Sequence, residues 1–183
     1  MKDHDPIQQL SDWIEEVRNS GIILADAMAL ATADADGTPD ARMVMVRKID
    51  ARGLFFFTDR TSAKGNQLRL NQRATLLSYW RELGRQVRIY GSVEKTTPTE
   101  DEEAFTVRPR QEQIAIAAWR QGDVIESQEQ LVVSYNRAEK RFRGREVARP
   151  TRWGGYILVP SRFVFWQDSA DKMHHRQEYT RGT

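Results

Sequence analysis

Cysteine is absent from the 183 residues, so disulfides, thiolate metal sites and a catalytic thiol are excluded. Long hydrophobic runs are also missing, since no stretch approaches the roughly 18 consecutive apolar residues of a membrane-spanning helix. The first residues, MKDHDPIQQL, lack the apolar segment of a secretory signal. We therefore expect a cytoplasmic protein that does not enter a membrane.

A strong excess of one charge is lacking too. The 28 basic and 26 acidic residues give a formal net charge of +2, which is too small to indicate nucleic-acid binding. There is no H-E-x-x-H motif and no nucleophile elbow. His174 and His175 are adjacent, and on a strand they would point to opposite faces, so we expect no metal site.

The remaining composition is that of an ordinary globular protein. Hydrophobic residues make up 39% and charged residues 30% of the chain. We see no internal repeat, low-complexity segment or linker that would split it. The sequence therefore predicts one domain over residues 1–183.

The strongest structural pattern lies between Ala41 and Lys64. The period of two over a strand at residues 42–47, RMVMVR, places Arg42, Val44 and Val46 on one face and the other three residues on the opposite face. A turn at residues 50–53 follows, and residues 54–58 form a returning strand. Hydroxyl-bearing residues then lead into a helix that begins near Ala63 and Lys64. A helix start of this kind, with nearby cations, is a plausible phosphate site, although packing of a basic hairpin would explain the pattern as well.

The rest of the chain shows the same mixture of strands and helices. Further strands are predicted at residues 27–33, 74–80, 85–93, 154–159 and 162–166. Helices are predicted at residues 6–19, 63–70, 97–108, 112–119 and 127–142. Because the strands follow one another as antiparallel hairpins, we expect a mainly β protein with flanking helices (α+β), built as an antiparallel barrel or split barrel.

Three other places gather groups that rarely serve packing alone. Gln86 is an amide on a strand, where it could read the edge of a heterocycle or simply be solvated. Arg108 and Arg110 flank a proline, as binding groups or as solvated helix-end cations. Trp166 precedes the segment 172–176, KMHHR, which suits a flat anionic ligand or a mixed interface patch.

Several of these motifs occur in one collinear order that resembles the pyridoxamine 5'-phosphate oxidase family, the FMN-binding split-barrel flavoproteins. The motifs are RMVMVR at 42–47, FT at 57–58, AK at 63–64, RQV at 85–87, RPR at 108–110, RQ at 120–121, WGG at 153–155, FWQ at 165–167 and HHR at 174–176. The likeness runs from Asp5 to Tyr179. It implies a homodimer with FMN at the subunit interface.

The resemblance also implies a set of cofactor residues. Arg42, Lys64 and Thr58 would bind the phosphate and ribityl tail, and Gln86 would bind the ring edge. Gln121, Trp166 and Arg176 would complete the site from the other subunit. The full set implied for FMN is Arg42, Met43, Val44, Arg47, Phe57, Thr58, Ala63, Lys64, Gln86, Gln121, Gly122, Trp166 and Arg176.

On the substrate side the chain departs from the vitamin B6 enzyme of the family. The positions that hold the substrate phosphate there are Arg47, Ala104, Arg108 and Glu112 here. Ala104 has no hydroxyl, and the carboxylate of Glu112 would repel a phosphate dianion. Lys172 stands where the family has arginine, so the planar fork of a guanidinium is lost.

Other details resemble the branch of the family that acts in phenazine biosynthesis. These are DPIQQLSDW at 5–13, ALATAD at 29–34, KG at 64–65, YWRE at 79–82 and Ala104. The resemblance implies an FMN-dependent oxidase that passes electrons from a reduced aromatic carboxylate, a phenazine precursor, to O2 and yields H2O2. Arg108, Lys172 and His174 would bind the substrate, and the flavin would do the chemistry without a catalytic acid–base pair.

Two alternatives remain at the level of sequence. One is a pyridoxine/pyridoxamine 5'-phosphate oxidase with a rearranged phosphate pocket. The other is a split-barrel protein that binds flavin or haem without turnover, as a carrier or sensor.

Overall fold

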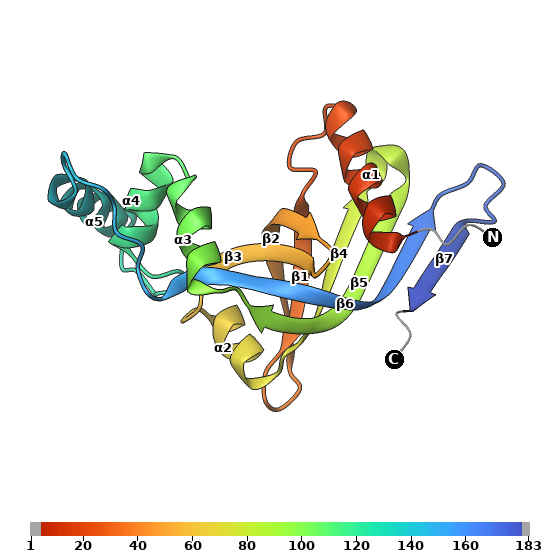
Figure 1. Ribbon diagram of the computed structural model, residues 1–183, viewed down its shortest axis with the longest axis horizontal. Coiled ribbons are helices and arrows are strands. Elements are labelled where there is room, and N and C mark those ends of the chain that lie inside the picture. The colour runs from red at the N-terminus through yellow and green to blue at the C-terminus, as the bar shows by residue number, and fades with distance from the viewer. Residues whose placement is uncertain (1–4, 181–183) are drawn as a thin grey trace. The chain divides into compact units, whose positions relative to one another are not determined.

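A computed structural model describes residues 5–180 of the chain (Figure 1). Its helices are α1 (Pro6–Asn19), α2 (Ala63–Leu70), α3 (Pro98–Thr106), α4 (Arg110–Ala118) and α5 (Gln128–Arg141), with a short 3-10 helix, η1 (Arg81–Leu83). Its strands are β1 (Ala27–Ala33), β2 (Pro39–Asp50), β3 (Gly53–Asp59), β4 (Arg73–Trp80), β5 (Arg85–Lys95), β6 (Trp153–Gln167) and β7 (His175–Thr180). The chain forms two compact units. A barrel unit contains the described residues of 1–56, 67–94 and 156–183, and a helical unit contains residues 57–66 and 95–155.

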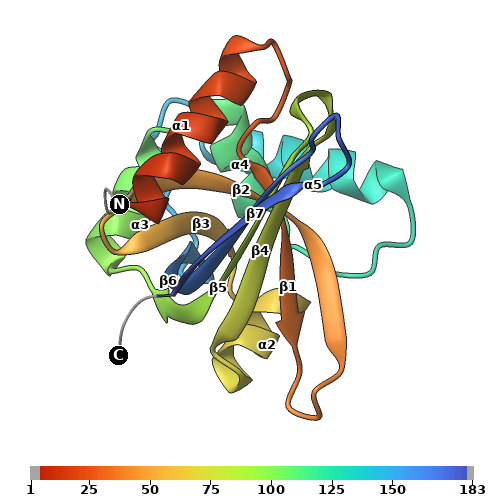
Figure 2. The same ribbon diagram turned by 90° about the vertical axis from the view of Figure 1, so that its right-hand side faces the viewer.

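The barrel unit is an antiparallel sheet closed on itself. Its strand order is β3-β2-β1-β4-β5-β6-β7, and β3 also pairs with β6, so six strands form the barrel and β7 extends beyond it (Figure 2). Closure removes the free sheet edges that would otherwise template aggregation. The predicted antiparallel split barrel is therefore confirmed.

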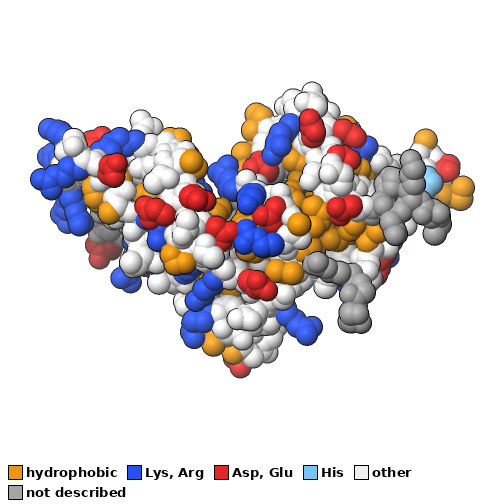
Figure 3. All heavy atoms as spheres, in the orientation of Figure 1, with side chains coloured by type: hydrophobic (Ala, Val, Ile, Leu, Met, Phe, Trp, Pro, Cys, Tyr) orange, Lys and Arg blue, Asp and Glu red, His pale blue; other side chains and the backbone are white. Residues whose placement is uncertain are grey.

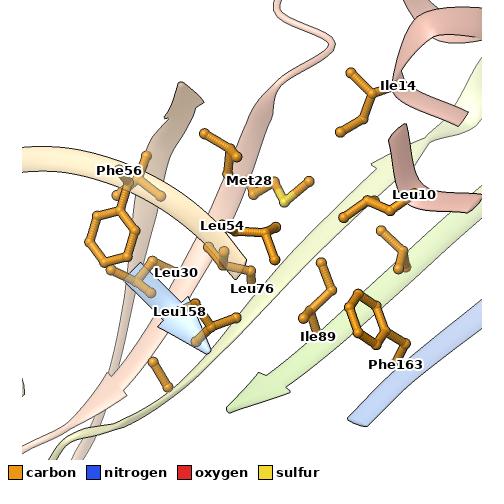
Figure 4. Packing of buried hydrophobic residues seen from close by; sticks show 14 of the residues in the cluster. Leu10, Ile14, Met28, Leu30, Leu54, Phe56, Leu76, Ile89, Leu158 and Phe163 are labelled. Carbon is orange, nitrogen blue, oxygen red and sulfur yellow. The ribbon is translucent and has the colours of Figure 1, made fainter. Parts of the chain in front are cut away.

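Alternation of side chains fills the barrel. On β2, Val44 and Val46 are buried while Met43 is exposed, as the period-two pattern predicts. From α1, Leu10 and Ile14 point toward the core residues of the strands (Figure 4). Asp5 caps this helix, because its carboxylate accepts a hydrogen bond from the amide of Ile7 at 2.9 Å.

Strand β6 is continuous over 15 residues, so the prediction of two separate strands at 154–159 and 162–166 is wrong. Pro160 suggests an interruption, but glycines on both neighbouring strands make room for this part of β6. A Cβ added at Gly53 would lie 2.0 Å from the Leu158 carbonyl oxygen, and one at Gly91 would lie 2.1 Å from that of Val159. The backbones thus approach more closely than any side chain would allow.

The helical unit has its own core. This core consists of buried side chains from α3, α4, α5, the connection that follows α5 and the start of β6: Phe105, Ile114, Ala138, Val147 and Trp153. A capping box begins α3, in which Thr97 and Glu100 satisfy each other's backbone amides. Basic side chains gather over α5 (Figure 3), whose last turn contains Lys140 and Arg141.

The last strand, β7, and the lengths of the helices differ in how well the sequence predicts them. Strand β7 is not among the elements that the sequence predicts, because its residues are mostly polar and exposed. Among residues 5–180, no helix is both long and apolar enough to cross a membrane.

Candidate active site

A buried lysine is the centre of one polar cluster in the helical unit. Lys64 lies near the start of α2, and its side chain is 7% exposed. Its Nζ donates hydrogen bonds to Thr58 Oγ1 at 3.1 Å, Ser62 Oγ at 3.3 Å and Gln121 Oε1 at 2.9 Å. We call Thr58, Ser62, Lys64 and Gln121 the Lys64 cluster. Burial of an ammonium group is costly unless such partners surround it, so the cluster is an ordered arrangement.

The Lys64 cluster joins three residues that the sequence assigns to the cofactor. Thr58 also donates directly to Gln121 Oε1 at 2.7 Å. Within one chain Gln121 thus contacts Lys64 and Thr58, and its role across a subunit interface stays a prediction. Ala63 precedes Lys64, and Gly122 follows Gln121 with a positive φ of 93° that favours glycine.

Arg152 holds the segment that contains Gln121. Its Nε donates to Asp59 Oδ2 at 2.8 Å, and its Nη2 donates to the carbonyl oxygens of Ile116, at 2.5 Å, and Trp119. A guanidinium is well placed there, since the last carbonyls of α4 lack helical partners and carry partial negative charge. The end of α4 is thereby tied to the end of β3, directly next to Thr58.

A cavity of about 230 Å³ adjoins this cluster. Its lining residues are Phe57, Thr58, Asp59, Arg108, Ala115, Ile116, Trp119, Gln121 and Trp153. The predicted substrate residue Arg108 thus shares one cavity with the predicted cofactor residues Phe57, Thr58 and Gln121. The indole of Trp153 stacks on Phe57 at 5.4 Å between ring centroids, and the Arg108 guanidinium lies 4.9 Å from the Trp153 ring.

Arg108 is also engaged by a carboxylate. Its Nη1 lies 2.9 Å from Glu112 Oε2, one helical turn further along the chain. The Arg108 side chain is 16% exposed and that of Glu112 is 50% exposed. The positive charge at this end of the cavity is therefore partly neutralised by the protein itself.

In the barrel unit, Arg42 belongs to a different network. It forms an ion pair with Asp40, and its Nη1 and Nη2 donate to Thr32 Oγ1 at 2.5 Å and Gln67 Oε1 at 2.9 Å. A hydrogen bond from Gln67 and the neighbouring Arg42 guanidinium lower the pKa of Asp40 below its ordinary value. A phosphate at Arg42 would have to compete with this carboxylate.

The other predicted cofactor residues of the barrel lie on strands β2 and β5. Gln86 is half-buried and opposite Tyr79 in the β4–β5 pairing. Met43 is exposed, and Arg47 lies 3.9 Å from Asp26. The Val44 side chain is part of the barrel core, so it is the backbone of Val44 that remains for a ligand.

The hairpin of β6 and β7 brings together the C-terminal candidates. Trp166 pairs with Arg176 across the two strands. The imidazole of His174 lies 5.0 Å from the Trp166 ring, between centroids, and its Nδ1 is 2.9 Å from Asp168 Oδ1. Lys172 has a positive φ of 63° in the turn.

Sequence reasoning misses several residues that shape these clusters. Asp40 and Gln67 engage Arg42, Arg152 holds the end of α4, and Asp168 contacts His174. Of these contacts, the ion pair of Asp40 with Arg42 could have been predicted from the DAR sequence at 40–42, because side chains two residues apart on a strand share a face. Arg152 and Asp168 act through tertiary contacts that leave no local pattern.

The chemistry of these donors fits a flavin mononucleotide. An ammonium, two hydroxyls and an amide in the Lys64 cluster are groups that bind phosphate and ribityl oxygens. The indole of Trp166 and the guanidinium of Arg176 suit a flat ring with polar edges. Within the described residues, no group of three or more His, Asp or Glu side chains is arranged to hold a metal ion.

Comparison with known proteins gives matches along the whole chain. A family model described as "Pyridoxamine 5'-phosphate oxidase" matches residues 15–142, and one described as "Pyridoxine 5'-phosphate oxidase C-terminal dimerisation region" matches residues 153–183. A pyridoxine/pyridoxamine 5'-phosphate oxidase of Rubrobacter xylanophilus is 42% identical over 98% of this chain and 82% of its own length. The corresponding enzyme of Microcystis aeruginosa is 40% identical over 97% and 83%.

Solved structures show the same fold. The crystal structure of PhzG from Burkholderia lata, in complex with tetrahydrophenazine-1-carboxylic acid, has a TM-score of 0.93 and 31% identity, and covers 99% of this chain and 89% of that one. An FMN binding protein of Nostoc punctiforme, related to pyridoxamine 5'-phosphate oxidase, has a TM-score of 0.69 at 15% identity. The chain belongs to the pyridoxamine 5'-phosphate oxidase family.

Proposed function

We propose that the protein is an FMN-dependent oxidase of a reduced, carboxylated phenazine precursor, with O2 as electron acceptor and H2O2 as product. The observation that carries this proposal is the ion pair, at 2.9 Å, of Arg108, which lines the cavity, with Glu112. A phosphate dianion there would meet the carboxylate as well as the guanidinium, whereas a monoanionic carboxylate has less charge to be repelled. The likeness to PhzG over nearly the whole chain supports the same substrate class.

The cavity walls support a flat aromatic substrate. Phe57 and Trp153, which both line the cavity, stack with their planes 13° apart. Ala104 packs against the core of the helical unit and offers no phosphate-binding hydroxyl. The aromatic side chains among the lining residues favour a planar ring, while Arg108 supplies one anchoring charge. Orientation of the ring is then the main contribution of the protein.

In this proposal the Lys64 cluster and Arg42 hold the phosphate and ribityl tail of FMN. Gln86, Trp166 and Arg176 contact its ring. When bound, the flavin supplies the two-electron chemistry that the side chains themselves lack. The family description of residues 153–183 as a dimerisation region supports a homodimer with the cofactor at its interface.

A second candidate is pyridoxine/pyridoxamine 5'-phosphate oxidase. Relatives with that name are 42% and 40% identical, which is more than the 31% identity to PhzG. For this activity Arg108 would have to break its ion pair with Glu112, or contact the Glu112 carboxylate and the substrate phosphate at the same time.

An anaerobic visible spectrum of the purified protein separates the candidates. After FMN is supplied, we expect flavin bands that bleach with tetrahydrophenazine-1-carboxylic acid but not with pyridoxamine 5'-phosphate. Bleaching by pyridoxamine 5'-phosphate alone would favour the second candidate. Bands that neither compound bleaches would indicate a flavin-binding protein without these activities, and absence of bands would overturn the cofactor assignment.

The variant Glu112→Gln makes the test sharper. Because it removes the carboxylate but keeps the side-chain size, it should lower the KM for pyridoxamine 5'-phosphate by roughly tenfold. Glu103→Gln, a neutralisation at an exposed position of α3, is the matched control and should leave that KM unchanged. An unchanged KM in Glu112→Gln would mean that the carboxylate does not exclude phosphate.

A further inference from the structure

The two faces of the β6–β7 hairpin have different surroundings. On one face, Phe165 packs edge-on against Trp13 of α1, with 5.0 Å between ring centroids. On that face Gln167 also accepts a hydrogen bond from Arg85 Nε at 2.9 Å. Side chains alternate along a strand, so the opposite face presents Trp166 and Arg176. Asp168 and His174 lie one position beyond the paired residues, and His174 contacts both Asp168 and the Trp166 ring on that second face. Figure 1 shows the hairpin of β6 and β7 that carries them.

Asp168 is held in place by its backbone. Its amide donates to the Gly84 carbonyl oxygen at 2.7 Å, which ties the turn to the connection between β4 and β5. Gly84 has a positive φ of 58°, and a Cβ there would lie 2.8 Å from the Cβ of Asp168. The close approach leaves the Asp168 carboxylate facing His174 Nδ1 at 2.9 Å.

A carboxylate that accepts a hydrogen bond from Nδ1 determines the protonation state of the other ring nitrogen, Nε2. An imidazole that donates its Nδ1 proton to a carboxylate exposes an unprotonated Nε2, which is an acceptor. The same carboxylate stabilises the imidazolium that forms when Nε2 takes up a proton. An unprotonated Nε2 can take a proton from a substrate. An imidazole that only orients an anion would instead have to present a protonated nitrogen as hydrogen-bond donor.

We infer that His174 is the proton acceptor of the reaction and that Asp168 is the positioning residue that sets its tautomer. The inference rests on the proposed function. The substrate class is a reduced nitrogen heterocycle with a ring N–H. FMN, when bound, would accept a hydride with its two electrons from the substrate. The proton of the ring N–H goes to His174 Nε2, and the nitrogen lone pair that remains forms the new double bond of the oxidised ring.

Three other ionisable residues near the turn have partners other than the imidazole of His174. His175 pairs with Gln167 and lies on the other face of the hairpin. Asp171 interacts with Ser169 and the Met173 amide within the turn. Arg176 lies on the same face as His174 but pairs with Glu178 at 3.4 Å. Asp168 is thus the carboxylate that reaches the imidazole of His174.

Nitrogen NMR of the imidazole rings tests the tautomer directly. The sequence has three histidines, so the His174 signals are identified by their loss in His174→Asn. In the holoprotein we expect a protonated Nδ1 and an unprotonated Nε2. Asp168→Ala should shift the proton toward Nε2. A wild-type His174 protonated at Nε2, or one that Asp168→Ala leaves unchanged, would overturn the role of Asp168.

Kinetics test the proton transfer. With tetrahydrophenazine-1-carboxylic acid, Asp168→Asn keeps an acceptor oxygen but removes the charge, and kcat should fall roughly tenfold to a hundredfold with KM changed less than about threefold. The double variant Asp168→Asn/His174→Asn should be no slower than His174→Asn alone. His175→Asn is the matched control and should retain wild-type kcat.

The outcomes separate this inference from the proposed function. A rise in KM at constant kcat in Asp168→Asn would make the pair a binding element and overturn proton acceptance. Absence of turnover in the wild type, with this acid and with pyridoxamine 5'-phosphate, would overturn the proposed function and the proton step together. The tautomer measurement would then still decide whether Asp168 sets the imidazole.

Discussion

The Lys64 cluster and the β6–β7 turn both carry predicted cofactor or substrate residues, but they differ in burial. Lys64, Thr58 and Ser62 are 5–7% exposed, and their polar atoms are hydrogen-bonded to one another and to Gln121. In the turn, Asp168 and residues 170–178 are exposed. The polar atoms of the Lys64 cluster are hydrogen-bonded within a single chain, whereas the turn presents its functional groups to its surroundings.

The two regions would therefore bind a ligand in different ways. The Lys64 cluster is preorganised, so binding costs little further ordering of its side chains. The turn keeps its shape through short-range contacts such as the hydrogen bond of the Lys172 amide to the Ser169 carbonyl oxygen, at 3.0 Å. In the homodimer of the proposed function, we expect the second subunit to lie over this turn.

Replacement of Arg152, next to the Lys64 cluster, should change the free energy of unfolding more than any other substitution proposed below. Arg152→Met removes the partner of Asp59, which is 5% exposed, and leaves the Ile116 and Trp119 carbonyls without their donor. Breaking a buried pair in this way should lower the free energy of unfolding by about 3–5 kcal/mol. Urea unfolding monitored by circular dichroism measures it. Arg143→Met, at an exposed position, is the control, and an equal effect in both variants would contradict the burial argument.

Loss of the ammonium at the centre of the Lys64 cluster should come next. Lys64→Ala removes the cation that would bind the FMN phosphate or ribityl oxygens, so the Kd of FMN should rise roughly tenfold to a hundredfold. Quenching of flavin fluorescence during titration of the apoprotein gives the Kd. Lys48→Ala, which removes an exposed lysine of β2 paired with Asp50, should leave it unchanged. A Lys64→Ala variant that retains full FMN affinity would show that the cluster is structural.

Gly84→Ala should affect the exposed turn by a smaller amount. A methyl group at a positive φ costs about 1–2 kcal/mol. Here it would also press on Asp168, so we expect both a lower free energy of unfolding and a weaker Asp168–His174 contact. Thermal unfolding and the imidazole NMR signals measure the two effects. Gly37→Ala shares the positive φ but has open space around its Cβ, so it should cause the strain without altering the His174 signals.

The smallest effect concerns pH. A hydrogen bond from Ser169, one from the Met173 amide and the charge of His175 lower the pKa of Asp171 below its ordinary value of 3.8. The ionised carboxylate is therefore favoured in the folded turn. Its stabilisation is fully present above pH 3.8 and is lost as the pH falls through the lower folded pKa. The protection factor of the Met173 amide, which is its exchange rate corrected for the intrinsic pH dependence, should fall over that range in the wild type but stay constant in Asp171→Asn.

The sequence predicts the barrel well because strands such as β4 alternate between core and surface, while β3 and β6 are rich in buried apolar residues. It does not predict β7, which has few apolar residues, or the continuity of β6 through Pro160, which depends on glycines of other strands. In the site, Thr58 and Lys64 are predicted together because they are six residues apart. The contact of Gln121 with them depends on how Arg152 fixes the end of α4. The contact of Asp168 with His174 requires a turn in which Lys172, a residue that rarely takes a positive φ, adopts one.

The close approach of β6 to Gly53 and Gly91 constrains how this barrel can diverge over evolutionary time. A methyl group at either glycine would meet a main-chain oxygen, so repacking of side chains could not relieve the clash. The β6–β7 turn can change in length and composition without touching that contact. Descendants of such a barrel should therefore inherit its wall unchanged and acquire new substrates through the turn.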